Sequence, residues 1–262
     1  MIKQSTTFLL SLLSPGLGYF HKGDNKSFYK TIIVFFSILA AGVIFRFFVS
    51  FWGLTGILLS IIAVYVFTAI HAMKKAEYRS PSGKSSGLLK LCFTLSFLLL
   101  TSLTFANRRT IMGFDIMSMD VTVMQPTLLQ GERFLVDTWV QKNELKRGTI
   151  VVHSFHGQRG FYLNRIVAVQ NDRVEIKGGV LIINGQAQPE PYILPANATK
   201  PESRNMNTVL IPTGHYFVLG DNRDASFGDS RFNGPIAVKN VIGKVTDIIS
   251  SRDKSRIGTI IK

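Results

Sequence analysis

The residues that could carry out chemistry gather in three stretches of the C-terminal half. The first is Val123–Glu132, the second is Tyr162–Val167, and the third, Gly220–Arg231, is the richest in carboxylates, hydroxyls and arginines. A serine hydroxyl becomes a nucleophile only when a base lies within hydrogen-bond reach. A lysine can be that base only if burial lowers its pKa toward neutrality. The question is therefore whether these stretches contain a serine and a base that together could hydrolyse a peptide bond.

The first two stretches resemble motifs of the bacterial type I signal peptidases, the serine peptidases of family S26. The first is similar to the family's Ser-Met-x-Pro-Thr-Leu, and its matching residues are Met124, Pro126 and Thr127. Val123 stands at the position of the nucleophilic serine. The second is similar to Tyr-x-Lys-Arg-Val-Val, where Arg165 matches and Asn164 stands at the position of the general-base lysine.

The third stretch resembles the family's Gly-Asp-Asn-Arg-x-x-Ser-x-Asp-Ser-Arg, with one residue inserted near Gly228. The resemblance implies that Ser226 would orient the missing lysine and that Asp229 and Arg231 pair structurally. The inserted residue leaves the placement of Ser226 open. We expect the whole matching set to be scaffold: Gly220, Asp221, Asn222, Arg223, Ser226, Asp229, Ser230 and Arg231.

Two replacements at these positions predict a divergent family member without the Ser/Lys pair. Valine has no nucleophilic atom, and an asparagine amide is not a base. Val121 also stands two residues before the serine position, where many relatives place a hydroxyl that helps the oxyanion hole. Loss of one such donor typically costs about 100- to 1000-fold in rate. The family's chemistry cannot occur at Val123 and Asn164 if this alignment holds.

Other groups could replace the pair, and we weighed each of them. Ser118 repeats the Ser-Met dipeptide upstream and is a weak alternative nucleophile, whereas Thr122 should point to the opposite face of an extended chain. His153 and His156 could act as bases, but we interpret them as ordinary polar positions. Together with His215 they lack a recognisable zinc-ligand spacing, so we expect no metal and no cofactor.

Charge and cysteine content narrow the class of protein. The chain of 262 residues has 30 Lys and Arg against 16 Asp and Glu, a net charge of +14. In residues 1–106 the basic excess lies largely in loops between apolar runs, which indicates membrane topology rather than nucleic-acid binding. It also suits contact with anionic lipid headgroups. Cys92 is the single cysteine, so no intramolecular disulfide can form.

We expect residues 1–106 to form a membrane region of three or four apolar segments. The run Tyr29–Met73 is too long for one span, because about 45 helical residues measure roughly 67 Å and a bilayer core is only about 30 Å thick. We therefore predict spans near 29–48, 54–73 and 88–106. Residues 5–21 are broken by Ser14–Gly18, and a re-entrant or interfacial segment there is as plausible as a fourth helix.

The loop Lys74–Lys84 sets the predicted orientation. It has four basic residues against one glutamate and should be cytoplasmic, so that residues 107–262 reach the extracytoplasmic side. We expect a multi-pass protein of the bacterial cytoplasmic membrane.

Residues 107–262 should form an all-β domain of the signal peptidase type. Short apolar runs punctuated by turn residues predict strands, and they occur at 134–136, 149–152, 166–169, 174–176, 180–183 and 216–219. Asn184-Gly185 and Gly178-Gly179 are hairpin signals, and Pro189–Pro201 should be a surface loop. The fold class is therefore N-terminal transmembrane α-helices followed by an all-β extracytoplasmic domain.

The sequence leaves three hypotheses for function. The first is a catalytically inactive protein that binds exported preproteins or pilin-like segments, or that assists an active peptidase or assembly machinery. The second is an active signal peptidase with a nonstandard catalytic pair, which removes signal peptides after small residues. The third is a structural membrane subunit.

Overall fold

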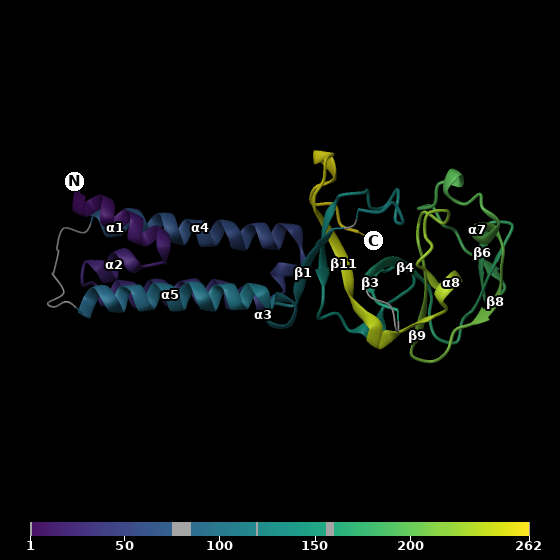
Figure 1. Cartoon of the computed structure of the whole chain (residues 1–262), viewed down its shortest axis with the longest axis horizontal. Helices are drawn as coiled ribbons and strands as arrows, with labels where there is room; N and C mark the ends of the chain where they lie inside the picture. The colour runs from purple at the N-terminus through teal and green to yellow at the C-terminus, as the bar shows by residue number, and fades with distance from the viewer. Residues whose placement is uncertain (1, 75–84, 119, 156–159, 262) are drawn as a thin grey trace. The chain divides into compact units, whose positions relative to one another are not determined.

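A computed structural model describes residues 2–74, 85–118, 120–155 and 160–261, and divides the chain into two compact units, Met1–Gly113 and Phe114–Lys262. The first unit is helical and the second is built from β-strands (Figure 1). The fold class is confirmed as apolar helices followed by a β domain. The helical unit continues beyond Ala106 to Gly113, because the short helix α6 (Arg108–Ile111) follows α5 after Asn107.

Within the described residues, three helices of the first unit are long and apolar enough to cross a membrane, over Asn25–Ile44, Phe51–Lys74 and Gly87–Ala106. They correspond to α3 (Asn25–Ile44), α4 (Phe51–Lys74) and α5 (Ser85–Ala106). Asp24 starts α3 by accepting a hydrogen bond from the Ser27 amide. Arg46 has a φ of 57° in the turn that ends it, before the 3-10 helix η1 (Phe47–Val49). The chain therefore turns between α3 and α4 at Arg46–Ser50, within the stretch 46–56 where the long apolar run was expected to fold back.

Residues 5–21 form a broken segment and no single span. Helix α1 (Ile2–Leu13) ends at Ser14, and Gly16, with a φ of 81°, leads into α2 (Leu17–His21). At 1.5 Å per residue α1 measures about 18 Å, which is short of a bilayer core. A Cβ on Gly18 would lie 2.1 Å from Ser11 Oγ, so glycine lets α1 and α2 pack closely. The loop 75–84 that we expected to be cytoplasmic lies outside the described residues.

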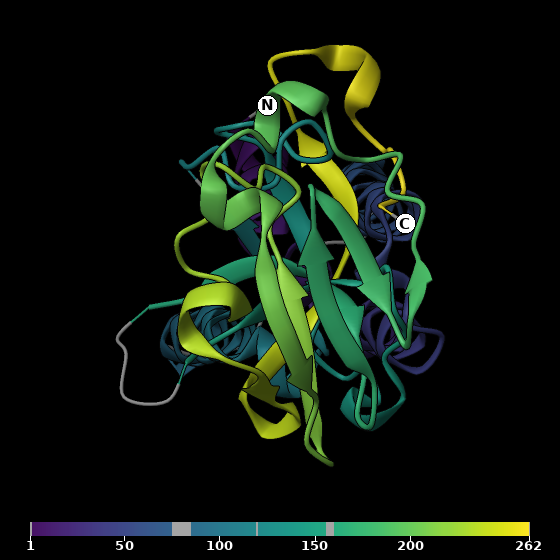
Figure 2. The same ribbon diagram turned by 90° about the vertical axis from the view of Figure 1, so that its right-hand side faces the viewer.

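The β domain contains two antiparallel sheets over its described residues. The larger has seven strands in the order β1-β2-β11-β3-β4-β9-β10, and the smaller has four in the order β7-β6-β5-β8. Figure 2 views the domain from the side of the smaller sheet. The strands are β1 (Phe114–Ser118), β2 (Arg133–Asp137), β3 (Ile150–His153), β4 (Tyr162–Ala168), β5 (Arg173–Lys177), β6 (Val180–Ile183), β7 (Gln186–Ala187), β8 (Met206–Leu210), β9 (His215–Leu219), β10 (Ile236–Ala237) and β11 (Val241–Ser250).

Short helices connect these strands. They are η2 (Lys142–Glu144), η3 (Pro195–Asn197), α7 (Pro201–Arg204), α8 (Ser230–Asn233), η4 (Val238–Asn240) and η5 (Lys254–Arg256). The hairpin turn between β6 and β7 uses Asn184 and Gly185, whose φ values are 53° and 80°. No described residue of 189–201 belongs to a strand, as the prolines predicted.

The larger sheet is buried on both faces. Ile150 and Val152 pack into one apolar cluster with Met124 and Leu163, while Val151 packs into another with Val218. Successive residues of a strand point to opposite faces. Two covered faces therefore explain why these strands are continuous apolar runs in the sequence, and they fix the register of β3 and β4.

Candidate active site

The three motif stretches meet around Gly220, directly after β9. A Cβ at this glycine would lie 2.8 Å from the carbonyl oxygen of Val123 and 2.4 Å from Ser226 Oγ. The Val123 carbonyl also accepts a hydrogen bond of 3.0 Å from the Asn222 amide. Only a residue without a side chain lets these groups approach so closely. Gly220 therefore joins the first stretch to the third.

Asn164 connects the second stretch to the same place. Its side chain is buried on β4, and Nδ2 donates to Ser226 Oγ at 3.3 Å. On its other side Oδ1 accepts a bond of 2.9 Å from His153 Nε2. The structure thus places Ser226 beside Asn164 despite the inserted residue. Gly228 makes room for the insertion, because a Cβ there would lie 2.6 Å from the Tyr162 ring.

His153 is the main correction to the sequence analysis. It is fully buried on β3 and is not an ordinary polar position on the surface. In the antiparallel register Val151 lies opposite Asn164 and His153 opposite Tyr162, so His153 and Asn164 are diagonal neighbours on one face. Sequence reasoning missed this contact. Pairing β3 with β4 in sequence would have indicated the contact, because each of these largely apolar strands has a polar residue, His153 or Asn164, on the same face.

Burial keeps the His153 imidazole neutral. It lowers the pKa of His153 to about 4, although the hydrogen bond from Nε2 to Asn164 opposes the shift. Since Nε2 donates its proton to an amide oxygen, the free lone pair is on Nδ1, which is buried without a partner among the described residues. The ring contacts Phe155 edge-on at a centroid distance of 4.9 Å. This histidine therefore has neither the direction nor the access that a general base needs.

Val123, where the resemblance places the nucleophile, contributes apolar surface. It is partly buried and packs against the cluster that contains Met124, Leu163 and Val152. Pro126 follows a cis peptide bond from Gln125 in the same turn. Val121, at the position of the oxyanion-hole hydroxyl, is largely exposed.

A buried ion pair fixes the turn after Val123. Arg165 Nη2 and Nε donate to the Asp221 carboxylate at 2.7 and 2.9 Å, and both side chains are almost fully buried. Thr127 Oγ1 donates to the same carboxylate at 2.5 Å. The guanidinium also lies 4.1 Å from the centre of the Tyr192 ring. Thr127, Arg165 and Asp221 thus connect all three stretches through one carboxylate.

A second ion pair holds the third stretch itself. Asp229 starts α8 by accepting from the Arg231 amide, and its Oδ2 also pairs with Arg231 Nη2 at 2.9 Å. The same Nη2 donates to the carbonyl oxygens of Arg223 and Ser226 at 2.6 and 2.9 Å. Ser230 Oγ accepts from the Val218 amide at 2.9 Å. These bonds fix the backbone on which Ser226 is carried.

The loop Pro189–Pro201 is attached to the same scaffold, which the sequence did not predict. Glu190 forms an ion pair with Arg223, and Asp224 accepts hydrogen bonds from the amides of Thr199 and Lys200 at 2.8 and 3.1 Å. Burial raises the pKa of Asp224, but hydrogen bonds led by that of Ser203 hold it well below the usual range of a carboxyl.

A small pocket of about 250 Å³ lies beside Leu163, next to Asn164 in the chain. Its lining is mostly apolar and comes from Met117, Ser118, Phe134, Val152, Phe161 and Leu163. Ser118 is exposed at the end of β1, where it pairs with Arg133 of β2. The weak alternative nucleophile therefore lies at a pocket whose described lining contains no histidine, lysine or acid. His156, the other alternative base, lies outside the described residues.

Among the described residues, no group of three or more histidines, cysteines or acids is placed to hold a metal ion. His153 donates to Asn164, whereas the His215 ring contacts the Thr213 carbonyl oxygen. The arrangement around Gly220 offers buried hydrogen bonds and two ion pairs. It lacks a hydroxyl with an adjacent base at the two positions where the resemblance places them.

Comparison with known proteins identifies the family. Residues 90–249, more than half of the chain, match the family described as signal peptidase, peptidase S26. The chain belongs to this family. Among curated relatives, signal peptidase IB of Staphylococcus aureus strain Mu50 is 36% identical over 138 residues, covering 47% of this chain and 71% of that protein.

Another curated relative is the probable thylakoidal processing peptidase 2, chloroplastic, of Arabidopsis thaliana. It is 34% identical over 158 residues, which cover 53% of this chain and 41% of that protein. A crystal structure of a signal peptidase I from Enterococcus faecalis V583 is 29% identical, covers 39% of this chain and 97% of its own, and has a TM-score of 0.35.

Proposed function

We propose that this signal peptidase-like protein binds segments of exported proteins without cleaving them. The observation that carries the proposal is the state of Asn164, whose amide is shared between His153 and Ser226. A base at this position would need a free lone pair directed at residue 123. The amide is too weak a base to accept a proton, and Val123 has no atom to activate. Hydrolysis by the family's route is therefore lost at both ends of the catalytic pair.

A sheet edge and a neighbouring pocket support peptide binding, the second part of the proposal. Strand β1 is at the edge of the larger sheet, paired with β2 alone among the described strands. An extended chain can add to such an edge through backbone hydrogen bonds. The edge ends at Ser118, where the pocket of about 250 Å³ begins. A pocket of that size and lining suits a small apolar side chain, and the family acts on exported preproteins.

The test compares cleavage and binding on one preprotein that has an Ala-x-Ala site. The full chain in detergent and a Val123→Ser/Asn164→Lys double variant are incubated with it, and products are read by mass spectrometry. We expect no cleavage by the natural chain. Cleavage by the double variant would show a competent groove that lacks only its chemistry, whereas cleavage by the natural chain would contradict the proposal.

Binding is measured separately, by photocrosslinking of an Ala-x-Ala peptide to the natural chain. Ser118→Trp should fill the pocket and abolish crosslinking, while Leu210→Trp, at an exposed position of the smaller sheet, should not. No crosslink with any variant would favour the third hypothesis, a structural membrane subunit. Crosslinking that is unchanged by both substitutions would mean that the peptide binds at another site.

An active peptidase remains the second candidate, and Ser118 is the observation that favours it. This hydroxyl is exposed and lines the pocket, although no described base contacts it. If the natural chain cleaves the preprotein, a Ser118→Ala variant decides the question. Loss of cleavage would identify Ser118 as the nucleophile of a nonstandard pair.

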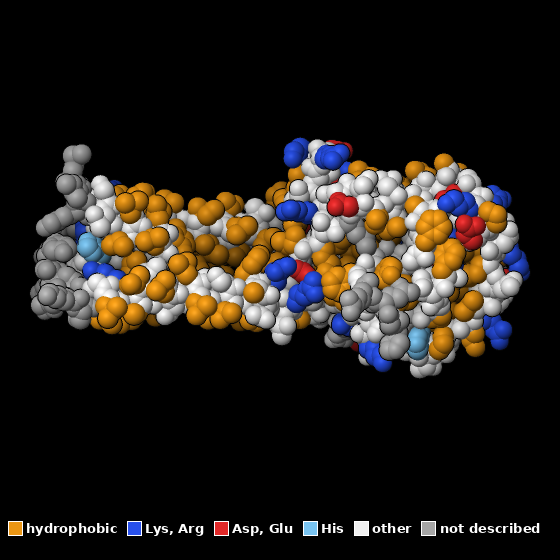
Figure 3. Space-filling view, viewed as in Figure 1, with side chains coloured by type: hydrophobic (Ala, Val, Ile, Leu, Met, Phe, Trp, Pro, Cys, Tyr) orange, Lys and Arg blue, Asp and Glu red, His pale blue; other side chains and the backbone are white. Residues whose placement is uncertain are grey.

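We further propose that the three apolar helices make this a multi-pass protein of the bacterial cytoplasmic membrane, with the β domain on the extracytoplasmic side. The hydrophobic surface of the helices in Figure 3 supports a membrane environment. The basic loop 74–84 supports the orientation. Protease digestion of sealed spheroplasts should remove the β domain. Protection of the domain until the membrane is opened would reverse this orientation.

A further inference from the structure

A groove in the helical unit has the chemical polarity of a lipid molecule. It measures about 280 Å³ and lies among α2, α3 and α4, and its lining is Tyr19, Ser27, Lys30, Thr31, Val34, Val64, Phe67, Thr68 and His71. None of these residues is acidic. Val34 and Phe67 are exposed, so the groove opens outward from the helices.

The groove changes from polar to apolar along the helix axes. Along α3 its lining runs from Ser27 and Lys30 to Val34, and along α4 it runs in reverse order from His71 to Val64. The seven steps along the helix from residue 27 to residue 34 span about 10 Å. Both helices therefore place their polar lining at the same end. A ligand that fits must have an anionic or strongly polar head and an apolar body.

The polar end lies in a positively charged region. Lys22 Nζ donates to the Met73 carbonyl oxygen at 3.1 Å, and Lys90 Nζ lies 3.2 Å from His21 Nδ1. Burial lowers the pKa of His21, and the charges of Lys90 and Lys22 lower it further. Figure 3 shows histidine and Lys or Arg side chains at the end of the helical unit that carries α2.

The donors at this end are held in place. Tyr19 is buried, and its hydroxyl lies 2.7 Å from His71 Nδ1. When Tyr19 donates to Nδ1, the other ring nitrogen, Nε2, carries a proton and can donate to a ligand. The His71 ring also stacks on the Phe67 ring, with an angle of 11° between their planes. Asp24, between α2 and α3, caps α3 through the Ser27 amide.

We propose that this groove binds an anionic phospholipid. Its phosphate lies between Lys30 and His71, and one acyl chain follows the apolar half along Val34 and Val64. A free phosphate ion would use the polar end alone and would leave the apolar half empty. The site is separate from the β domain, so the proposal does not depend on whether the chain cleaves or binds peptides.

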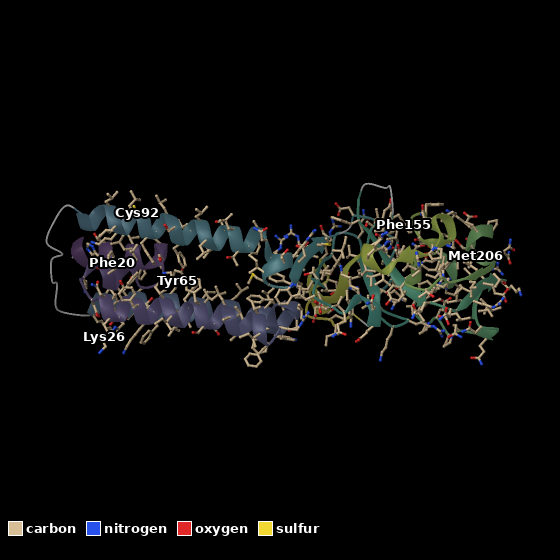
Figure 4. The ribbon with its side chains drawn as sticks, turned by 90° about the horizontal axis from the view of Figure 1, so that it is seen from below. Phe20, Lys26, Tyr65, Cys92, Phe155 and Met206 are labelled. Carbon is tan, nitrogen blue, oxygen red and sulfur yellow. The ribbon has the colours of Figure 1, made fainter. Side chains whose placement is uncertain are left out.

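The experiment is native mass spectrometry of the full chain in detergent with equal amounts of phosphatidylglycerol and phosphatidylcholine. The natural chain should retain the anionic lipid preferentially. Lys30→Ala should lower that preference roughly fivefold, as expected for one basic residue near an anionic headgroup. The matched control is Lys26→Ala, one turn earlier on α3, whose side chain projects away from the helices in Figure 4 and does not line the groove.

A second variant tests the apolar half. Val64→Trp should reduce retention of both lipids, while the thermal unfolding of each variant is checked against that of the natural chain. Equal retention of the two lipids by the natural chain would overturn the proposal. So would an equal loss in Lys26→Ala and Lys30→Ala. Displacement of the lipid by excess inorganic phosphate would assign the site to the free anion instead.

Discussion

His153 donates a hydrogen bond of 2.9 Å from Nε2 to Oδ1 of Asn164, and both side chains are buried. This bond explains why an amide is stable at a position where the family's motif has a lysine. An amide can accept from one neighbour while it donates to another, here Ser226. The pair therefore fills the position of the motif's lysine with a neutral, hydrogen-bonded contact.

Replacement of Asn164 by leucine should destabilise the β domain by about 1–3 kcal/mol, because it leaves the buried His153 and Ser226 groups without this partner. Asn207→Leu, at an exposed position on β8, is the control and should change stability by less than about 0.5 kcal/mol. The chain has two tryptophans, Trp52 and Trp139. In a Trp52→Phe background, urea unfolding followed by Trp139 fluorescence reports the β domain alone. Equal effects of both leucines would mean that the contact contributes nothing.

Removal of the Asp221 carboxylate should be more costly. Asp221→Ala leaves the buried Arg165 guanidinium without its charge partner, and breaking such a pair typically costs about 3–5 kcal/mol. The ion pair of Lys177 with Glu175 is more exposed, and Glu175→Ala should cost much less, because solvent screens such a pair. The same Trp139 measurement compares the two. A small loss in Asp221→Ala would show that water reaches Arg165 in its place.

A methyl group at residue 220 should disturb the meeting point of the three stretches. Its Cβ would lie 2.4 Å from Ser226 Oγ, so Gly220→Ala forces the backbone or Ser226 to move, at about 1–3 kcal/mol. In the Val123→Ser/Asn164→Lys background it should also lower any restored cleavage. Gly87→Ala, where a Cβ meets nothing within 4 Å, is the control and should alter neither stability nor cleavage.

The sequence predicted the fold class because its signals are local. Apolar runs of two different lengths separate membrane helices from strands, and Asn184-Gly185 marks a hairpin at the turn that the structure has. It did not predict β1, β7, β8, β10 or β11. Strand β11 carries Lys244 and Asp247 among its apolar residues, and its pairing with β2 and β3 shifts register, so no regular pattern identifies it.

The site was less predictable than the fold. Motif order indicated which stretches should meet, but the contacts of Asn164 depend on a residue from a separate strand, His153. An isolated histidine on an apolar strand has no sequence feature that distinguishes a buried contact from a surface position. The attachment of the proline-rich loop through Glu190 and Asp224 was missed for the same reason. Such contacts follow from tertiary packing and not from spacing along the chain.

Burial of His153 predicts a pH dependence of stability. Its pKa is about 4 in the folded protein and 6.5 in the unfolded chain. Between these values the unfolded chain binds the extra proton, so the free energy of unfolding rises with pH across this window. The free energy of unfolding should be roughly 3 kcal/mol higher above about pH 6.5 than below about pH 4 because of this one group. Urea titrations of the Trp52→Phe chain from pH 4.5 to 7.5 measure the slope.

The control for this slope is His153→Gln, which keeps a side-chain donor for Asn164 and removes the titrating ring. Carboxylates titrate at lower pH. Burial raises the pKa of Asp172, for example, but hydrogen bonds led by that from Arg147 lower it below its usual value in the folded protein. Such groups change the free energy of unfolding only near and below their unfolded pKa. The range from pH 5 to 6.5 therefore isolates the histidine. An unchanged slope in His153→Gln would show that another group titrates there, and that His153 is open to water in the folded domain.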